Sequence, residues 1–172
     1  MAEMHNANVL RNYKFFVTFG TPIGVGSDAT SQLGFQTVSG LSQESEVIEY
    51  REGTNAAWMA KMPGQVSVGD VTFERGAASD KQYGSALVQW YTQVKNVMEN
   101  NAITTSGVRR TIFIDVAKEI DVTASAPGGR MRYELGRAWP SSLEIGDLDS
   151  GSSEVLIETM TVVAETLTVG EV

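Results

Sequence analysis

The sequence predicts a mainly β domain, an antiparallel β-barrel or sandwich with one flanking α-helix. Apolar and polar residues alternate in several successive runs that are joined by turns, and a single stretch repeats its apolar residues at spacings of three and four. Val, Ile and Thr, which favour strands, supply 42 of the 172 residues. Strands that follow one another without helices between them pair antiparallel. The length fits one domain over residues 1–172.

The alternation of apolar and polar residues places the strands, and glycine and proline mark where they end. Residues 1–10 show no period and are interpreted as a flexible N-terminal arm. Gly69–Asp70 predicts a bulge or bend within one strand, and Trp139–Pro140 predicts the end of another, because proline cannot donate to a ladder. Residues 53–64 are bounded by glycines and predict an extended loop. The predicted strands are 11–19, 33–38, 45–52, 65–75, 108–116, 130–138, 141–148 and 154–167.

The helix is predicted over about 80–98. Its apolar residues, among them Leu87, Trp90 and Val94, fall on one face, which indicates packing against a core. Ser79 followed by Gln82 fits a capping box at its start.

The charge of the chain is acidic and uneven. Thirteen Lys and Arg stand against 21 Asp and Glu, which gives a formal net charge of −8. Such a chain does not favour sequence-specific nucleic-acid binding, which needs a basic face. Residues 141–172 hold seven of the acids and no Lys or Arg. No run of about 18 apolar residues predicts a membrane helix, so we expect no membrane insertion by the monomer.

The residues do not point to an active site or a cofactor. The chain has no Cys, and its one histidine, His5, lies in the expected arm, so thiolate, zinc and Ser-His-Asp chemistries lack their groups. Pairs of acids, Asp147 with Asp149 or Glu154 with Glu158, have the spacing of glycosidase carboxylates but also of any solvated acidic sheet. We therefore predict no catalytic residues, no metal and no cofactor, and a protein that is not an enzyme.

Four segments of the chain carry a family pattern. They are Gly34–Leu41 continuing through Glu46–Gly53, Met62–Gly64 with Val71–Gly76, the helix containing Trp90 and Tyr91, and Ala138–Pro140 with Gly146–Asp149 and Glu154–Thr159. In this order, and over roughly residues 12–167, they resemble the inner tube protein of contractile phage tails and of related bacterial contractile injection systems. The main departure is the stretch 116–129, where the family has a short hairpin.

The resemblance implies hexameric rings that stack into a tube with a continuous β-lined lumen. It implies partners as well: further copies of the chain, a contractile sheath protein, baseplate and tube-terminating proteins, and a tape-measure protein or cargo in the lumen. It also implies synthesis in the bacterial cytoplasm and assembly in a phage tail or injection particle.

Residues 53–64 would be the loop that reaches a neighbouring subunit or ring. The contact candidates are Glu49, Arg51, Glu52, Trp58, Met59, Lys61 and Met62. The residues that match the family's motifs are Gly40, Tyr50, Gly53, Pro63, Gly64, Arg75, Gly76, Trp139, Pro140, Gly146, Asp147, Glu154 and Glu158.

Three alternatives remain open from the sequence. A carbohydrate-binding β-sandwich would be a monomer with exposed aromatic residues. A hydrolase would depend on the acid pairs. A type VI secretion tube protein would share the tube role, although the string Glu49–Gly53 favours the phage and injection-particle branch.

Overall fold

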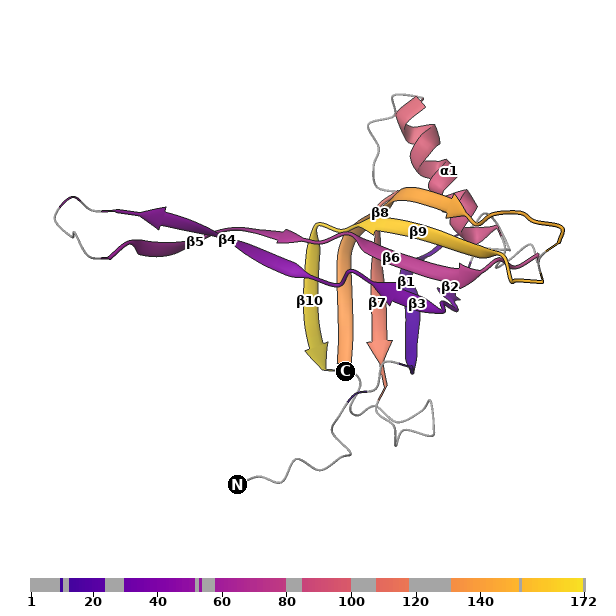
Figure 1. Cartoon of the computed structure of the whole chain (residues 1–172), viewed down its shortest axis with the longest axis horizontal. Coiled ribbons are helices and arrows are strands. Elements are labelled where there is room, and N and C mark those ends of the chain that lie inside the picture. The colour runs from indigo at the N-terminus through magenta and orange to yellow at the C-terminus, as the bar shows by residue number, and fades with distance from the viewer. Residues whose placement is uncertain are drawn as a thin grey trace, which may run out of the picture.

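The chain folds as two antiparallel sheets around one core, with a helix at one end and a long hairpin that projects away from the body (Figure 1). The computed structural model describes residues 10, 13–23, 30–51, 53, 58–79, 85–99, 108–117, 131–151 and 153–171. Its elements are β1 (Phe15–Ile23), β2 (Thr30–Leu33), β3 (Thr37–Ser39), β4 (Gln43–Tyr50), β5 (Ala60–Val68), β6 (Val71–Gly76), α1 (Ala86–Glu99), β7 (Arg110–Val116), β8 (Met131–Ile145), β9 (Ile157–Val163) and β10 (Thr166–Glu171). The predicted class, mainly β with antiparallel pairing and one helix, is confirmed.

Strand β8 belongs to both sheets. Its first half pairs with β7 and β10, and its second half pairs with β9. We call β2-β1-β7-β8-β10 the first sheet and β8-β9-β6-β3 the second sheet. The strand turns between them at Arg137, which has a φ of +54°, a left-handed value that is uncommon outside glycine.

The predicted end of a strand at Trp139–Pro140 is wrong, because β8 continues to Ile145. The ladder between β8 and β9 shifts register between Pro140 and Ser142. At such a bulge a residue without an N–H is tolerated, so proline sits inside the strand.

Three predicted strands are in fact parts of two strands each. The run 33–38 holds the end of β2 and the start of β3, the run 65–75 divides at Gly69–Asp70 into β5 and β6, and the run 154–167 divides after Val163 into β9 and β10. In each case the two parts join different sheets, which alternation along the chain does not reveal. The predicted loop 53–64 also needs correction, because Ala60–Gly64 is part of β5.

The core lies between the sheets. The first sheet contributes Val17, Ile112 and Leu135, and the second contributes Phe73 and Met160, all of them at most 2% exposed. At about 25 cal/mol per Å² of apolar surface removed from water, burial of this kind is the main stabilising term of the fold.

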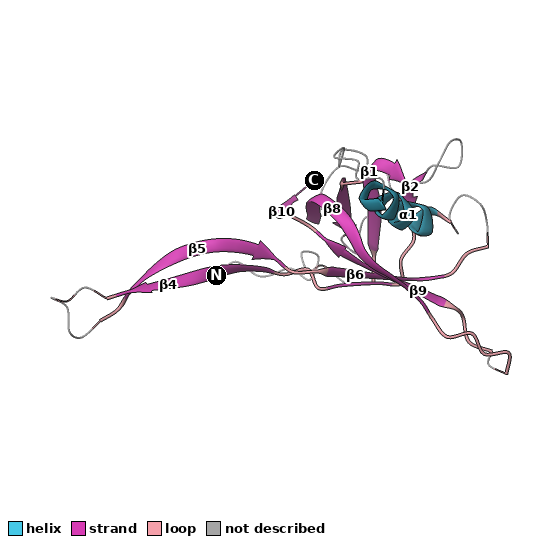
Figure 2. Ribbon diagram, turned by 90° about the horizontal axis from the view of Figure 1, so that it is seen from above, coloured by secondary structure: helices cyan, strands magenta, loops and turns pink. Residues whose placement is uncertain are grey.

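Helix α1 closes one end of the core through Leu87 and Trp90 (Figure 2). The Trp90 indole donates a hydrogen bond to the Val108 carbonyl at 2.8 Å, and its ring meets Phe19 edge-on. The predicted apolar face is confirmed for these residues, but Met98, which the same spacing assigns to that face, is 72% exposed. Residues 80–84, and with them the capping partner of Ser79, lie outside the described residues. Within the described part of the chain no helix is long and apolar enough to cross a membrane.

Candidate functional site

The hairpin of β4 and β5 is the part of the described chain least covered by the rest of the molecule. The two strands pair antiparallel, with Ile48 opposite Met62 and Tyr50 opposite Ala60, and form a sheet of their own (Figure 1). All eight residues of β4 are exposed. Because a two-stranded hairpin is marginally stable alone in water, an extended one with both faces bare indicates a partner surface.

The hairpin exposes apolar side chains on both of its faces. Ile48, Tyr50 and Met62 share one face and are 46%, 54% and 47% exposed. Val47 and Val66 lie on the other face and are 59% and 57% exposed. Clustered exposed apolar residues of this kind mark interaction sites in soluble proteins.

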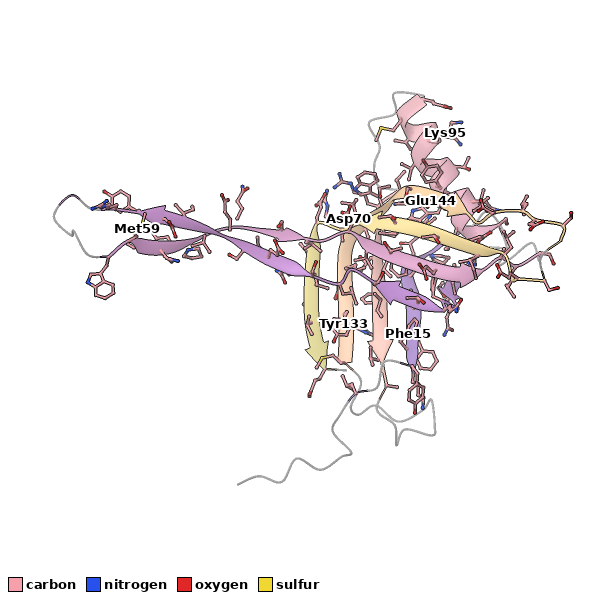
Figure 3. All side chains as sticks on the ribbon, in the orientation of Figure 1. Phe15, Met59, Asp70, Lys95, Tyr133 and Glu144 are labelled. Carbon is pink, nitrogen blue, oxygen red and sulfur yellow. The ribbon has the colours of Figure 1, made fainter. Side chains whose placement is uncertain are left out.

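The tip adds two large side chains to this surface. Trp58 is 77% exposed and Met59 is 53% exposed. Figure 3 shows Met59 toward the far end of the hairpin. Aromatic residues and Met are enriched in the buried parts of protein interfaces. Gly53 is an exposed turn residue near this end. We call the set Val47, Ile48, Tyr50, Trp58, Met59, Met62 and Val66 the hairpin surface.

Of the four polar contact candidates, two pair with each other within the subunit. Glu49 and Lys61 lie opposite each other and form an exposed ion pair at 3.4 Å within the subunit. Arg51 is exposed, and Glu52 lies outside the described residues. The structure thus brings together the apolar candidates, while their contact with a neighbour remains a prediction.

Glycines fix how the hairpin joins the body. Gly40 has a φ of +85°, and a Cβ there would collide with the Asp70 carbonyl oxygen. Gly69 donates to the Ser42 carbonyl at 3.0 Å across the same junction. Further out, a Cβ at Gly64, which follows Pro63, would lie 3.0 Å from the Glu46 Cβ. The chain therefore leaves β3, runs out through β4 and returns through β5 to β6 at a closely packed base.

Arg75 and Glu158 form an ion pair inside the second sheet. They face each other across β6 and β9, and Glu158 accepts hydrogen bonds from Nε at 3.0 Å and from Nη2 at 2.8 Å. The two residues are 4% and 6% exposed. These two family-motif positions link neighbouring strands of one sheet from its buried side, and Glu158 is held by Arg75 rather than placed beside Glu154 as a catalytic pair.

The remaining motif positions lie at ends and edges. Pro140 is fully buried, whereas Trp139 is half-buried beside the end of α1, where it lines a cavity of about 100 Å³. Gly146 donates to the Ile157 carbonyl at 2.9 Å. Gly76 ends β6, and Asp147 and Glu154 are exposed in the connection between β8 and β9.

An ion pair between β7 and β8 and a buried arginine of β7 were not anticipated from the sequence. Asp115 accepts from Arg132 at 2.7 and 2.8 Å, and this hydrogen bonding raises the pKa of Arg132. Arg110 is buried, donates to the Thr21 carbonyl at 3.0 Å, and has its pKa lowered by that burial. Their only sequence signal is a charge within an alternating strand, which equally fits a solvated face.

The described residues offer no assembled catalytic centre. Among them no group of three His, Cys, Asp or Glu is placed to hold a metal ion. A cavity of about 550 Å³ opens between the sheets, and its lining, which includes Phe15, Val38, Ile114 and Tyr133, contains no carboxylate or amine. The exposed surfaces that could contact other copies are therefore the better candidates for a functional site.

Both sheets end in strands with a free edge in the described part of the chain. The first sheet ends in β2 and β10, and the second sheet ends in β3 and the second half of β8. Unpaired N–H and C=O groups along such edges can accept a strand from another copy.

Comparison with known proteins agrees with this geometry. A chain of the extracellular contractile injection system "PVC sheath-tube complex in extended state" is 24% identical, with a TM-score of 0.68 and coverage of 95% of this chain and 93% of that chain. A chain of the anti-feeding prophage baseplate, 6-fold symmetrised, is 25% identical, with a TM-score of 0.69 and coverage of 95% and 96%. A chain of the anti-feeding prophage tube-terminating cap is 25% identical, with a TM-score of 0.67 and coverage of 100% of both.

A comparison with curated proteins gave no match. The family model described as "T4-like virus tail tube protein gp19" matches residues 11–168, which includes both sheets, the hairpin and the helix. The resemblance identified in the sequence is confirmed: the chain belongs to the T4-like virus tail tube protein family.

Proposed function

We propose that the chain forms hexameric rings that stack into the inner tube of a contractile tail or injection particle. In this role it is a structural conduit for DNA or protein cargo and performs no catalysis. The hairpin surface supplies contacts with a neighbouring copy, and the free sheet edges supply strand pairing within a ring.

The observation that carries the proposal is the hairpin, because its apolar residues are exposed on both faces. One partner can cover only one face of a two-stranded ribbon. In a tube, both faces of the hairpin can be covered at once, because an extended hairpin can lie between two adjacent copies. Burial of Trp58 and Met62 in such a contact would remove large apolar side chains from water and favour association.

The compared structures support partners of the expected kinds. They come from assemblies described as a sheath-tube complex, a baseplate and a tube-terminating cap. By analogy we propose that this chain contacts a sheath protein on its outer side and baseplate or terminating proteins at the ends of the tube. A tape-measure protein or cargo would occupy the channel. Synthesis in the bacterial cytoplasm would precede assembly.

The test is electron microscopy of the purified full chain over a range of salt and protein concentrations. We expect rings and stacked tubes. Monomers alone under every condition would overturn the proposal.

A pair of variants tests the hairpin. The double variant Trp58→Ser/Met62→Ser should retain a folded monomer and lose stacked tubes, because it removes two large apolar side chains of the hairpin surface and no core residue. Met98→Ser, which changes a side chain that is 72% exposed on the helix, is the matched control and should leave the tubes unchanged. Normal tubes from the hairpin variant would show that the hairpin surface is not the contact.

A further inference from the structure

The hairpin carries two methionines whose side chains are open to solvent in the free subunit. Met59 directly precedes β5 and is 53% exposed, and Met62 lies within β5 and is 47% exposed. Both belong to the hairpin surface, which a neighbouring copy would cover in the tube proposed above. The same two side chains would therefore be accessible before assembly and covered after it.

The other methionines in the described part of the chain lie in different surroundings. Met160 is in the core and 1% exposed, Met131 at the start of β8 is partly buried, and Met98 near the end of α1 is 72% exposed. Because oxidation follows exposure, a mild oxidant should reach Met59, Met62 and Met98 and spare Met160. The chain has no Cys, so no thiol of its own competes for the oxidant.

Met62 stands among apolar neighbours on one face of the hairpin. The register places it directly opposite Ile48, and the next pair on the same face is Tyr50 with Ala60. None of these four side chains carries a charge. A copy that covers this face would therefore enclose the Met62 thioether in a mainly apolar contact.

Oxidation would change the polarity of this surface. Hydrogen peroxide transfers one oxygen atom to the thioether sulfur, so that a sulfur–oxygen bond forms, the O–O bond of the peroxide breaks and water leaves. The sulfur loses two electrons, which reduce the peroxide. The product, methionine sulfoxide, is a polar and chiral side chain that disrupts interfaces built on methionine. Its oxygen accepts hydrogen bonds, and burial without a donor disfavours the contact.

We propose, on the basis of the tube described above, that Met59 and Met62 are an oxidation site that controls assembly. Sulfoxide formation in the free subunit blocks the hairpin contact and keeps the oxidised subunit out of the tube. Assembly covers the same two side chains, so a finished tube resists the oxidant that inactivates its free subunits.

The modification is of a reversible kind. Methionine sulfoxide reductases, one for each sulfoxide epimer, remove the oxygen atom as water, with two electrons and two protons supplied by thiols that become a disulfide. All eight residues of β4 are exposed, so the oxidised hairpin of a free subunit is open to such an enzyme. Reduction would return the subunit to the pool that assembles.

The main test follows one sample of the unmodified chain, partly oxidised as monomers with hydrogen peroxide. The peroxide is removed, assembly is started, and sedimentation separates tubes from free subunits. Mass spectrometry then gives the sulfoxide fraction at each methionine in both. We expect sulfoxide at Met59 or Met62 to be about tenfold enriched among the free subunits. Sulfoxide at Met98 should be equally frequent in both and is the internal control, whereas equal frequencies at all three positions would overturn the inference.

A second measurement exposes finished tubes and monomers to the same peroxide. Met59 and Met62 should be oxidised about tenfold more slowly in tubes than in monomers, because the contact excludes the reagent. Met98 should react at the same rate in both states, and Met160 should react in neither. Oxidation of Met59 and Met62 in tubes at the monomer rate would overturn the proposed protection.

Reversal and substitution test the assignment to these two residues. Treatment of the oxidised subunits with both reductases and a thiol should restore assembly, and continued exclusion after full reduction would overturn the inference. Oxidation should lower the tube yield of Met98→Leu about tenfold, and that of Met59→Leu/Met62→Leu less than about twofold, each against its own untreated sample. A tenfold loss in the second variant would also overturn it. Failure of the unoxidised, unmodified chain to form tubes would instead refute the proposed function.

Discussion

Loss of one partner of the Arg75–Glu158 pair should destabilise the monomer severely. The variant Glu158→Leu removes a carboxylate that accepts two hydrogen bonds and leaves a guanidinium that is 4% exposed. Breaking a buried ion pair in this way costs about 3–5 kcal/mol, because the guanidinium loses its carboxylate partner in a site that excludes water. A domain of this size has only about 5–15 kcal/mol of stability to lose, so the variant would be close to unfolding at moderate temperature.

The double variant Arg75→Met/Glu158→Leu separates the cost of a stranded charge from the worth of the pair. Two apolar side chains of similar volume can replace a buried pair at little net cost, so the double variant should be more stable than Glu158→Leu. The interaction free energy between the two positions, taken from the double-mutant cycle, should be about 3 kcal/mol, the upper end of the range for residues in contact.

Urea unfolding, followed by tryptophan fluorescence on samples verified as monomeric, measures these differences. The single variant Arg75→Met completes the cycle, and matching slopes for the three variants and the unmodified chain would validate the comparison. A loss below about 1 kcal/mol in Glu158→Leu, or strictly additive effects of the two single changes, would refute the argument that burial makes this pair essential.

Three further changes test other parts of the fold. Gly40→Ala should cost about 1–3 kcal/mol in the same unfolding assay, because it forces a Cβ against the Asp70 carbonyl at a positive φ; a change within 0.5 kcal/mol, roughly, would contradict this. Trp90→Phe should cost about 1–3 kcal/mol, since it leaves the buried Val108 carbonyl without its indole donor. Lys61→Ala removes an exposed ion pair and should shift the unfolding free energy by less than about 0.5 kcal/mol, whatever it does to assembly.

Alternation was sufficient to place most strands because the sheets have one buried and one wet face. In β7, for example, Ile112 and Ile114 are buried and Phe113 between them is less so. Burial with a period of two produces the alternation that predicts a strand. The pattern could not show where a continuous run changes sheets. Gly69–Asp70, predicted as a bulge or bend within a strand, is the junction between β5 and β6. Trp139–Pro140, predicted as the end of a strand, lies inside the bent strand β8.

The ion pairs escaped prediction for a related reason. A charged residue on an alternating strand is usually solvated, and its burial depends on which strand lies opposite it. Arg75 and Glu158 are 83 residues apart, and only the register of β6 and β9 brings them together. Sequence spacing carries no information of that kind.

We therefore expect the family motifs to serve two physical tasks that the sequence alone does not separate. Arg75 and Glu158 are buried, so their substitution should be detected first as lost stability. Tyr50 and Pro63 stand on the two faces of a hairpin that contributes little to the core, so substitutions there should leave the monomer folded and change its assembly. A subunit of this kind needs both classes, because a rigid body fixes the direction of the hairpin, and only a hairpin of fixed direction can meet the same surface on every copy in a tube.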